Sequence, residues 1–328
     1  MSPTSRKHAI IAVVALLIPM IPGVLLFPLG LAQTVGLFIC GVLAGVLCAA
    51  MAGLRVSLAL SAILTVASFV AFLAASHPLW AGLVMAASAG LYGLSSRRGL
   101  MGVVTSAPIL IAFIVADPPE VLAHATEVEN AAVLALVVLA GALWGVLVGW
   151  FLTRSRKRPP VQASPVNVAI VQGIILAVAT GVTMAIVVAN NLQHGGAWII
   201  LTMLVIAQPA LGASYHKARQ RVLGTVFGFL LAFAFALVLP TGWPSLVVGL
   251  VFFALTVYVK LDSTRTYWQF TMFLTPGIVL VEGATTSVLS TDVTRLTCTL
   301  IGVAISLVII AIVNWYVKLK PVAHAKSA

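Results

Sequence analysis

Two arginines in the second half of the chain have the types and spacing to bind an anion. Arg219 and Arg221 follow a short polar run, and an apolar stretch that includes Thr225 begins directly after them. We expect both arginines to stand at the first turn of the helix that this stretch forms. Free backbone N–H groups and the positive end of the helix dipole attract anions at such a place. The pattern therefore predicts a site for carboxylates and similar anions at the mouth of a path.

Hydroxyl and amide side chains lie close to prolines in apolar stretches of both halves. Proline removes one helical hydrogen bond and frees a backbone carbonyl, which neighbouring hydroxyl groups or a polar ligand can use. Interruptions at corresponding places of two halves indicate the binding site of a transporter; the alternative is a pair of kinked helices that only pack. The residues concerned are Thr105, Ser106 and Pro108 in the first half, and Gln208, Gln269, Thr275 and Pro276 in the second.

A further arginine, Arg295, begins the last apolar stretch shortly after Asp292. Two interpretations stay open for it: an ion pair with Asp292 on one helical turn, or a gate for anions at the outer end of the path. No Asp, Glu, Lys or Arg lies near the centre of any predicted stretch, so the sequence shows no buried carboxylate relay for protons.

The composition excludes the water-soluble classes. Of the 328 residues 62% are hydrophobic and 8% charged, against about 25% charged in an ordinary soluble domain. A soluble fold of this length could not bury so much apolar surface. The three cysteines and six histidines have no metal-ligand spacing, and no acid cluster or Ser/His/Asp arrangement is present. We expect no enzyme activity, no metal and no cofactor.

The apolar stretches predict an all-α, polytopic membrane protein. A membrane-spanning helix needs about 20 mostly apolar residues, and charged, polar or Gly/Pro-rich breaks divide the chain into about twelve such stretches. They are 9–29, 31–53, 56–75, 79–95, 99–116, 131–153, 167–189, 197–213, 222–239, 244–259, 267–281 and 295–317.

The basic residues predict the orientation of these helices. With a cytoplasmic N-terminus, all of the 18 Lys and Arg residues except Arg295 fall on the cytoplasmic side, as the positive-inside rule requires. Both termini are then cytoplasmic, in a bacterial-type inner membrane. The net charge of +11 therefore orients the chain and does not indicate nucleic-acid binding. By the same rule, Arg219 and Arg221 can be read as topology determinants alone.

The two halves of the chain resemble each other at an offset of about half its length. Arg55 aligns with Arg221 and Pro78 with Pro244. Because each half has six helices, an even number, both copies would have the same orientation in the membrane. We predict a first six-helix unit at 1–153, a basic cytoplasmic linker at 154–166, a second unit at 167–320 and a tail at 321–328.

Glycines at helical spacing predict places of close helix packing. They are Gly224 and Gly228 in the second half, and Gly141, Gly145 and Gly149 in the first.

The second half resembles the fusaric acid resistance and aromatic acid exporter family. The resemblance covers residues 165–317. Its motifs are Trp198 and Thr202, Gln208-Pro209, the pattern RxRxxGTxxG from Arg219 to Gly228, Thr271 and Thr275, and Arg295, Thr299 and Gly302. It implies a six-helix unit, used twice per chain, in exporters of aromatic or other organic acids and related toxic compounds. A distant relationship to the plant aluminium-activated malate transporters fits an anion path lined by arginines. Many members carry a sizeable cytoplasmic domain beside each unit, whereas this chain has a short linker.

We therefore expect an inner-membrane transporter or exporter of amphipathic, including aromatic, organic acids. Its partners would be membrane lipid, a small organic anion, and a second copy of the chain or an envelope protein. Two alternatives stay open: a passive anion channel that is indifferent to a pH gradient, and a non-transporting scaffold or accessory subunit of an envelope system.

Overall fold

The computed structural model describes most of the chain. The described residues are 21–26, 28–122, 124–154, 163–192, 195–206, 211–240, 242–261, 265–282 and 288–319. Within these ranges only the backbone is described at residues 32, 211–215, 257, 260–261, 282, 288–292, 294–295 and 312–319.

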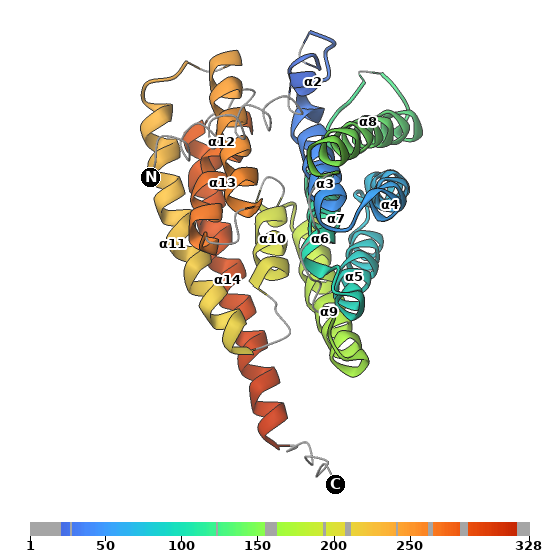
Figure 1. Ribbon diagram of the computed structural model, residues 1–328, viewed down its shortest axis with the longest axis vertical. Helices are drawn as coiled ribbons and strands as arrows, with labels where there is room; N and C mark the ends of the chain where they lie inside the picture. Colours follow the sequence, from blue (N-terminus) through green and yellow to red (C-terminus); the bar gives the residue numbers. More distant parts are fainter. Residues whose placement is uncertain are drawn as a thin grey trace.

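Every regular element in these ranges is a helix, which confirms the all-α class (Figure 1). The elements are α2 (Ile21–Val24), η2 (Ala32–Thr34), α3 (Val35–Met51), α4 (Leu54–Ala74), α5 (Pro78–Leu94), η3 (Ser95–Arg98), α6 (Met101–Val104), α7 (Ser106–Ala116), α8 (Glu127–Thr153), α9 (Val166–Ala189), α10 (Gly196–Ile206), α11 (Leu211–Ala236), α12 (Trp243–Leu261), α13 (Tyr267–Glu282) and α14 (Val288–Leu319).

The helices follow the predicted apolar stretches and make the chain a multi-pass membrane protein. Each stretch from 31–53 onwards contains a described helix, whereas 9–29 lies mostly outside the described residues. Five helical spans in the described ranges are long and apolar enough to cross a membrane, and several shorter apolar helices accompany them. The number of twelve spanning segments stays a prediction.

Local sequence explains where several helices begin. At the start of α8 the Thr126 hydroxyl accepts a hydrogen bond from the Glu129 backbone N–H, and the Glu129 carboxylate accepts one from the Thr126 N–H. This capping box satisfies two N–H groups that a helix leaves free at its first turn. α5 begins with Pro78, whose missing N–H has no helical partner at that position anyway.

The stretch 99–116 is interrupted inside the range 105–108 in which the break was expected. The helix divides at Thr105, between α6 and α7. Pro108 lies in the first turn of α7, where a missing N–H does not disrupt the helix. The interruption thus lies within the predicted range, at its first residue. In contrast, Pro276 lies inside the continuous helix α13.

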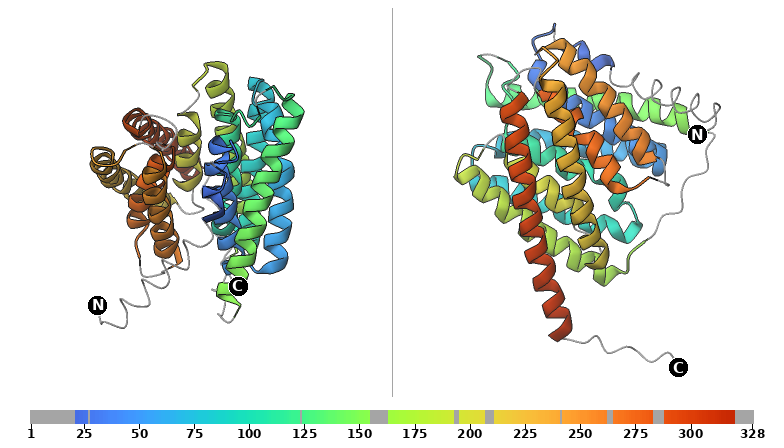
Figure 2. Two further views of the ribbon diagram at one scale, coloured as in Figure 1. Left: turned by 90° about the horizontal axis from the view of Figure 1, so that it is seen from above. Right: turned by 90° about the vertical axis from the view of Figure 1, so that its left-hand side faces the viewer.

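The helices form two groups that lie side by side, with α10 between them (Figures 1 and 2). One group contains α3 to α9 and the other α11 to α14. α10 contacts α7 and α9 in the first group and α11 and α14 in the second. Although the sequence places α9 in the second unit, it packs along α5, where Gly93 lies against the backbone of Gly173.

Several corresponding pairs of helices are in contact in both halves. α3 packs against α8 as α10 packs against α14, and α4 contacts α7 and α8 as α11 contacts α13 and α14. α5 contacts α7 as α12 contacts α13. These pairings support the proposal that the chain contains two copies of one unit, with the boundaries 1–153 and 167–320 that we predict.

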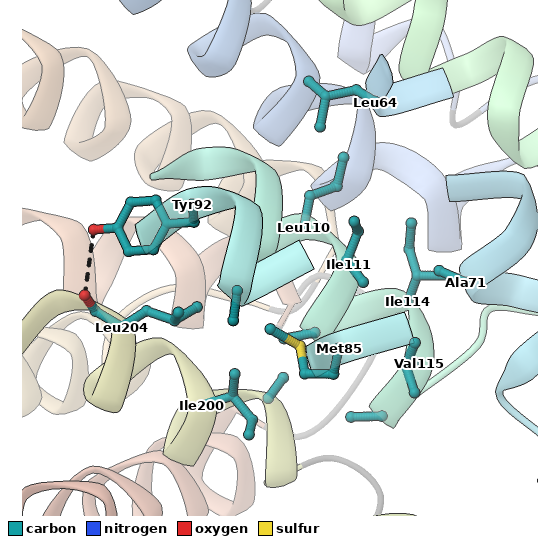
Figure 3. Close-up of a cluster of buried hydrophobic side chains, with 14 of the residues drawn as sticks. Leu64, Ala71, Met85, Tyr92, Leu110, Ile111, Ile114, Val115, Ile200 and Leu204 are labelled. Atoms are coloured by element: carbon teal, nitrogen blue, oxygen red, sulfur yellow. Dashed lines mark hydrogen bonds between the residues drawn. The ribbon is translucent and has the colours of Figure 1, made fainter. Parts of the chain in front are cut away.

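The largest apolar core surrounds α7 (Figure 3). Leu110 and Ile114 of α7 are buried in one cluster with Leu64 of α4, Met85 of α5 and Ile200 of α10. This core therefore joins α10 to the first group of helices.

Glycines allow α3 and α8 to pack backbone against backbone. Gly145 of α8 lies against the Val42 carbonyl of α3, and a Cβ at Gly149 would lie 2.8 Å from the Val46 carbonyl oxygen. Larger side chains at these places would separate the helices.

We predict that Gly145→Ala lowers the free energy of unfolding by about 1–3 kcal/mol, because the added methyl group overpacks the interface. Gly36→Ala in α3 is the matched control. A Cβ at Gly36 meets no atom within 4 Å, so the better helix propensity of alanine should raise stability by up to about 1 kcal/mol. Thermal unfolding of the full chain in detergent measures both changes. Equal changes in stability for Gly145→Ala and Gly36→Ala would contradict the close packing of α3 against α8.

Candidate functional site

Arg221 lies inside a long helix and not at its start. α11 begins at Leu211, so Arg221 stands about three turns from the first residue. The free N–H groups of the helix N-terminus are therefore not close to Arg219 or Arg221. The expectation that both arginines stand at the first turn is wrong, because the polar run before Arg221 is helical.

The two arginines lie on different faces of α11. Arg221 has an exposed fraction of 0%, whereas the side chain of Arg219 is exposed. Residues two positions apart point to nearly opposite sides of a helix. A single cluster of both guanidinium groups is therefore not formed.

The Arg221 guanidinium is only partly hydrogen-bonded. Its Nη1 donates to the Tyr267 hydroxyl at 3.5 Å. Nε and Nη2 have no hydrogen-bond partner among the described residues. An ionised group buried without a partner costs several kcal/mol, and such a residue in a membrane segment indicates function.

Thr225 follows Arg221 by one helical turn and faces the same side of α11. Its side chain is buried, and its hydroxyl has no partner in the described part of the chain. Together, Arg221 and Thr225 have three buried polar atoms without a described partner, on one face of α11.

Gly224 and Gly228 bring α13 against this part of α11. A Cβ at Gly224 would lie 2.6 Å from the Cβ of Thr271, and a Cβ at Gly228 would lie 2.5 Å from the Cβ of Thr275. Two glycines one turn apart thus allow the α13 threonines to reach the α11 backbone, as in other small-residue helix contacts.

The predicted Thr275–Pro276 interruption lies at this contact. Pro276 has no N–H for the Met272 carbonyl one turn earlier, and a Cβ at Gly228 would lie 2.9 Å from that carbonyl oxygen. The Thr275 hydroxyl itself donates to the Thr271 carbonyl at 3.0 Å. The freed carbonyl of Met272 therefore faces α11.

The polar groups of the first half lie around Tyr92. The buried Tyr92 hydroxyl donates to the Leu204 carbonyl of α10 at 3.3 Å (Figure 3), and Thr105 Oγ1 lies 3.4 Å from it. The Ser106 hydroxyl is buried without a partner among the described residues. Tyr92 of α5 therefore joins α10 to Thr105, the residue between α6 and α7.

Of Gln208, Gln269 and Arg295, the structure describes the side chain of Gln269 alone. Gln208 lies outside the described residues. Gln269 accepts a hydrogen bond from the Thr266 backbone N–H at 3.3 Å and so caps the start of α13. Arg295 lies about two turns into α14, which begins at Val288. The expectation that Arg295 begins the last helix is therefore wrong. The structure describes only the backbone of this residue.

Tyr267 and Thr299 are not among the site residues predicted from the sequence. Tyr267, Thr271 and Thr275 are spaced by four residues and so share one face of α13, which is a signal the sequence contains. Thr299 of α14 is buried, and its hydroxyl has no described partner. No local pattern distinguishes Thr299 from the other hydroxyl residues of that helix.

These features define an all-helical, multi-pass membrane protein with a buried cationic group. Residues 182–309 match the family described as fusaric acid resistance protein-like. This match confirms the family resemblance over a segment that includes Arg221, Thr225 and Tyr267.

The chain is also similar to the inner membrane protein YccS of Escherichia coli K12. The two are 31% identical over 118 residues, which is 35% of this chain and 16% of the relative. The match thus spans far less than two thirds of that protein. No solved structure matches the chain significantly.

We predict that Arg221→Met raises the free energy of unfolding by about 1–4 kcal/mol, because an apolar side chain of similar length replaces a buried charge without a counter-ion. Arg219→Met, at the exposed position, should change stability by no more than about 0.5 kcal/mol. Thermal unfolding in detergent compares the two variants. Lower stability of Arg221→Met would show that the guanidinium has a structural role.

Proposed function

We propose that the protein transports amphipathic organic acids, including aromatic ones, across a bacterial-type inner membrane in the direction of export. The observation that supports this proposal best is the buried, partly unpaired guanidinium of Arg221 between membrane helices. A fixed positive charge in an apolar region attracts an anion and compensates its loss of water. The similarity to the fusaric acid resistance protein-like family favours an organic acid as that anion.

The arginines and prolines then have separate tasks along the path. The exposed Arg219 attracts the anion at the cytoplasmic mouth, and Arg221 binds it inside the helix group. The polar groups at Thr105–Ser106 and Thr275–Pro276 line the central part, and Arg295 acts near the exit. The same proposal includes cytoplasmic termini, twelve spanning segments, and a second copy or an envelope protein as partner.

A passive anion channel is the second candidate. No Asp or Glu is among the buried side chains of the described residues, so the structure provides no carboxylate for proton coupling there. A channel would conduct the anion according to voltage and would be indifferent to a pH gradient.

Reconstitution into liposomes with a panel of labelled organic acids tests the proposal. We expect wild-type protein to move at least one acid, and Arg221→Gln to reduce uptake to the level of empty liposomes while inserting normally. Arg55→Gln is the matched control, because Arg55 is the exposed counterpart in the first half and its loss should leave uptake unchanged.

Each result of this experiment has a definite meaning. Uptake that depends on a pH gradient identifies a coupled transporter, and uptake that follows voltage alone identifies the channel. Normal uptake by Arg221→Gln would contradict the role of Arg221. Absence of uptake of every acid, with stable co-purification of a protein partner, would replace transport by the scaffold function.

A further inference from the structure

We propose that the Nε–Nη2 edge of Arg221 binds one carboxylate group through two parallel hydrogen bonds, and that this contact selects carboxylates over spherical anions. The inference deepens the proposed function, since it rests on an organic anion reaching Arg221. It concerns binding, however, and binding can be measured without transport.

The contacts of the guanidinium leave one particular edge free. Arginine presents its N–H groups in a rigid plane, and Nε and Nη2 point in the same direction along one side of it. The Tyr267 hydroxyl accepts a hydrogen bond from Nη1, at the other end of the plane. The two nitrogens without a described partner are thus the pair that can donate side-on.

A carboxylate matches this edge better than other small anions do. Its two oxygens accept one hydrogen bond each in the plane of the guanidinium, which is the bidentate geometry of strong arginine–carboxylate pairs. A chloride ion has a single centre and cannot accept two parallel, linear hydrogen bonds. A neutral amide of the same shape lacks the charge that would compensate the buried cation.

Thr225 supplies a further donor beside this edge. It lies one turn after Arg221 on the same face of α11, and its buried hydroxyl lacks a partner among the described residues. A carboxylate oxygen has lone pairs for more than one hydrogen bond, so it can also accept from this hydroxyl. Arg221 and Thr225 together therefore form a built site with three donors.

Tyr267 is a positioning residue for this site. Its hydroxyl holds Nη1, and Lys217 Nζ lies 5.2 Å from the centre of its ring. Loss of the hydroxyl leaves the charge of Arg221 in place but frees the plane of the guanidinium to rotate. Tyr267→Phe should therefore weaken the preference for carboxylate over chloride, rather than abolish anion binding.

The site occurs once among the described residues, despite the similarity of the halves. Arg55, which aligns with Arg221, is the second residue of α4 and is exposed. A second buried guanidinium is absent from the described residues. Saturation should therefore correspond to one carboxylate for each chain.

Ligand-dependent thermal stabilisation of the purified full chain tests the proposal. We expect sodium benzoate to raise the unfolding temperature, with benzamide having no effect and sodium chloride a smaller one at equal concentration. Arg221→Lys keeps the charge but loses the planar edge, so its apparent affinity for benzoate should fall about tenfold or more. Arg55→Lys is the matched control: Arg55 is exposed in the first half, and this variant should bind as the wild type does.

Three results would overturn the inference: no benzoate stabilisation of wild-type protein, equal stabilisation by chloride and benzoate, or an Arg221→Lys affinity within about twofold of wild type. If Arg221→Lys does not fold, Thr225→Val provides the test of the site. This variant should weaken benzoate binding about tenfold. Unchanged benzoate binding by Thr225→Val would contradict the site. Benzoate binding without flux in liposomes would contradict transport alone, whereas flux with normal binding by Arg221→Lys would contradict this site alone.

Discussion

The close approach of α13 to α11 determines where the polar groups of the candidate site lie. Gly224 and Gly228 have no side chain, so Thr271 and Thr275 lie directly against the α11 backbone. This approach also places the Tyr267 hydroxyl beside Arg221. The covered guanidinium is shielded from water, which therefore cannot complete its hydrogen bonds. The anion that we propose to bind there would supply the compensation that the described side chains do not provide.

The two halves have similar helix contacts but differ in the burial of one arginine side chain. α4 begins at Leu54, so Arg55 stands in the first turn of its helix and is exposed. α11 begins at Leu211, and its additional turns carry Arg221 into the helix group. The first half contributes uncharged groups, Tyr92 and Thr105, at the place where α10 is in contact. Among the described residues, the longer helix α11 thus buries a guanidinium in the second half, whereas Arg55 of the first half stays exposed.

α10 packs against both groups of helices. Ile200 is buried in the core around α7, whereas Ile199 and Thr202 lie against Gly302 of α14. The Leu204 carbonyl accepts the hydrogen bond from Tyr92. A displacement of α10 would therefore alter the packing of both groups together, which is the kind of coupling that movement of one unit against the other requires.

The sequence by itself determined the class of protein, the position of nearly every described helix and the family resemblance of the second half, because apolar length and motif spacing are local properties. It also contained the four-residue spacing of Tyr267, Thr271 and Thr275. It could not distinguish Arg219 from Arg221, recognise the polar run after Leu211 as helix, or fix the exact residue at which the helix divides within 105–108. Only the tertiary structure decided these points, because burial of a side chain depends on which distant helices pack against it.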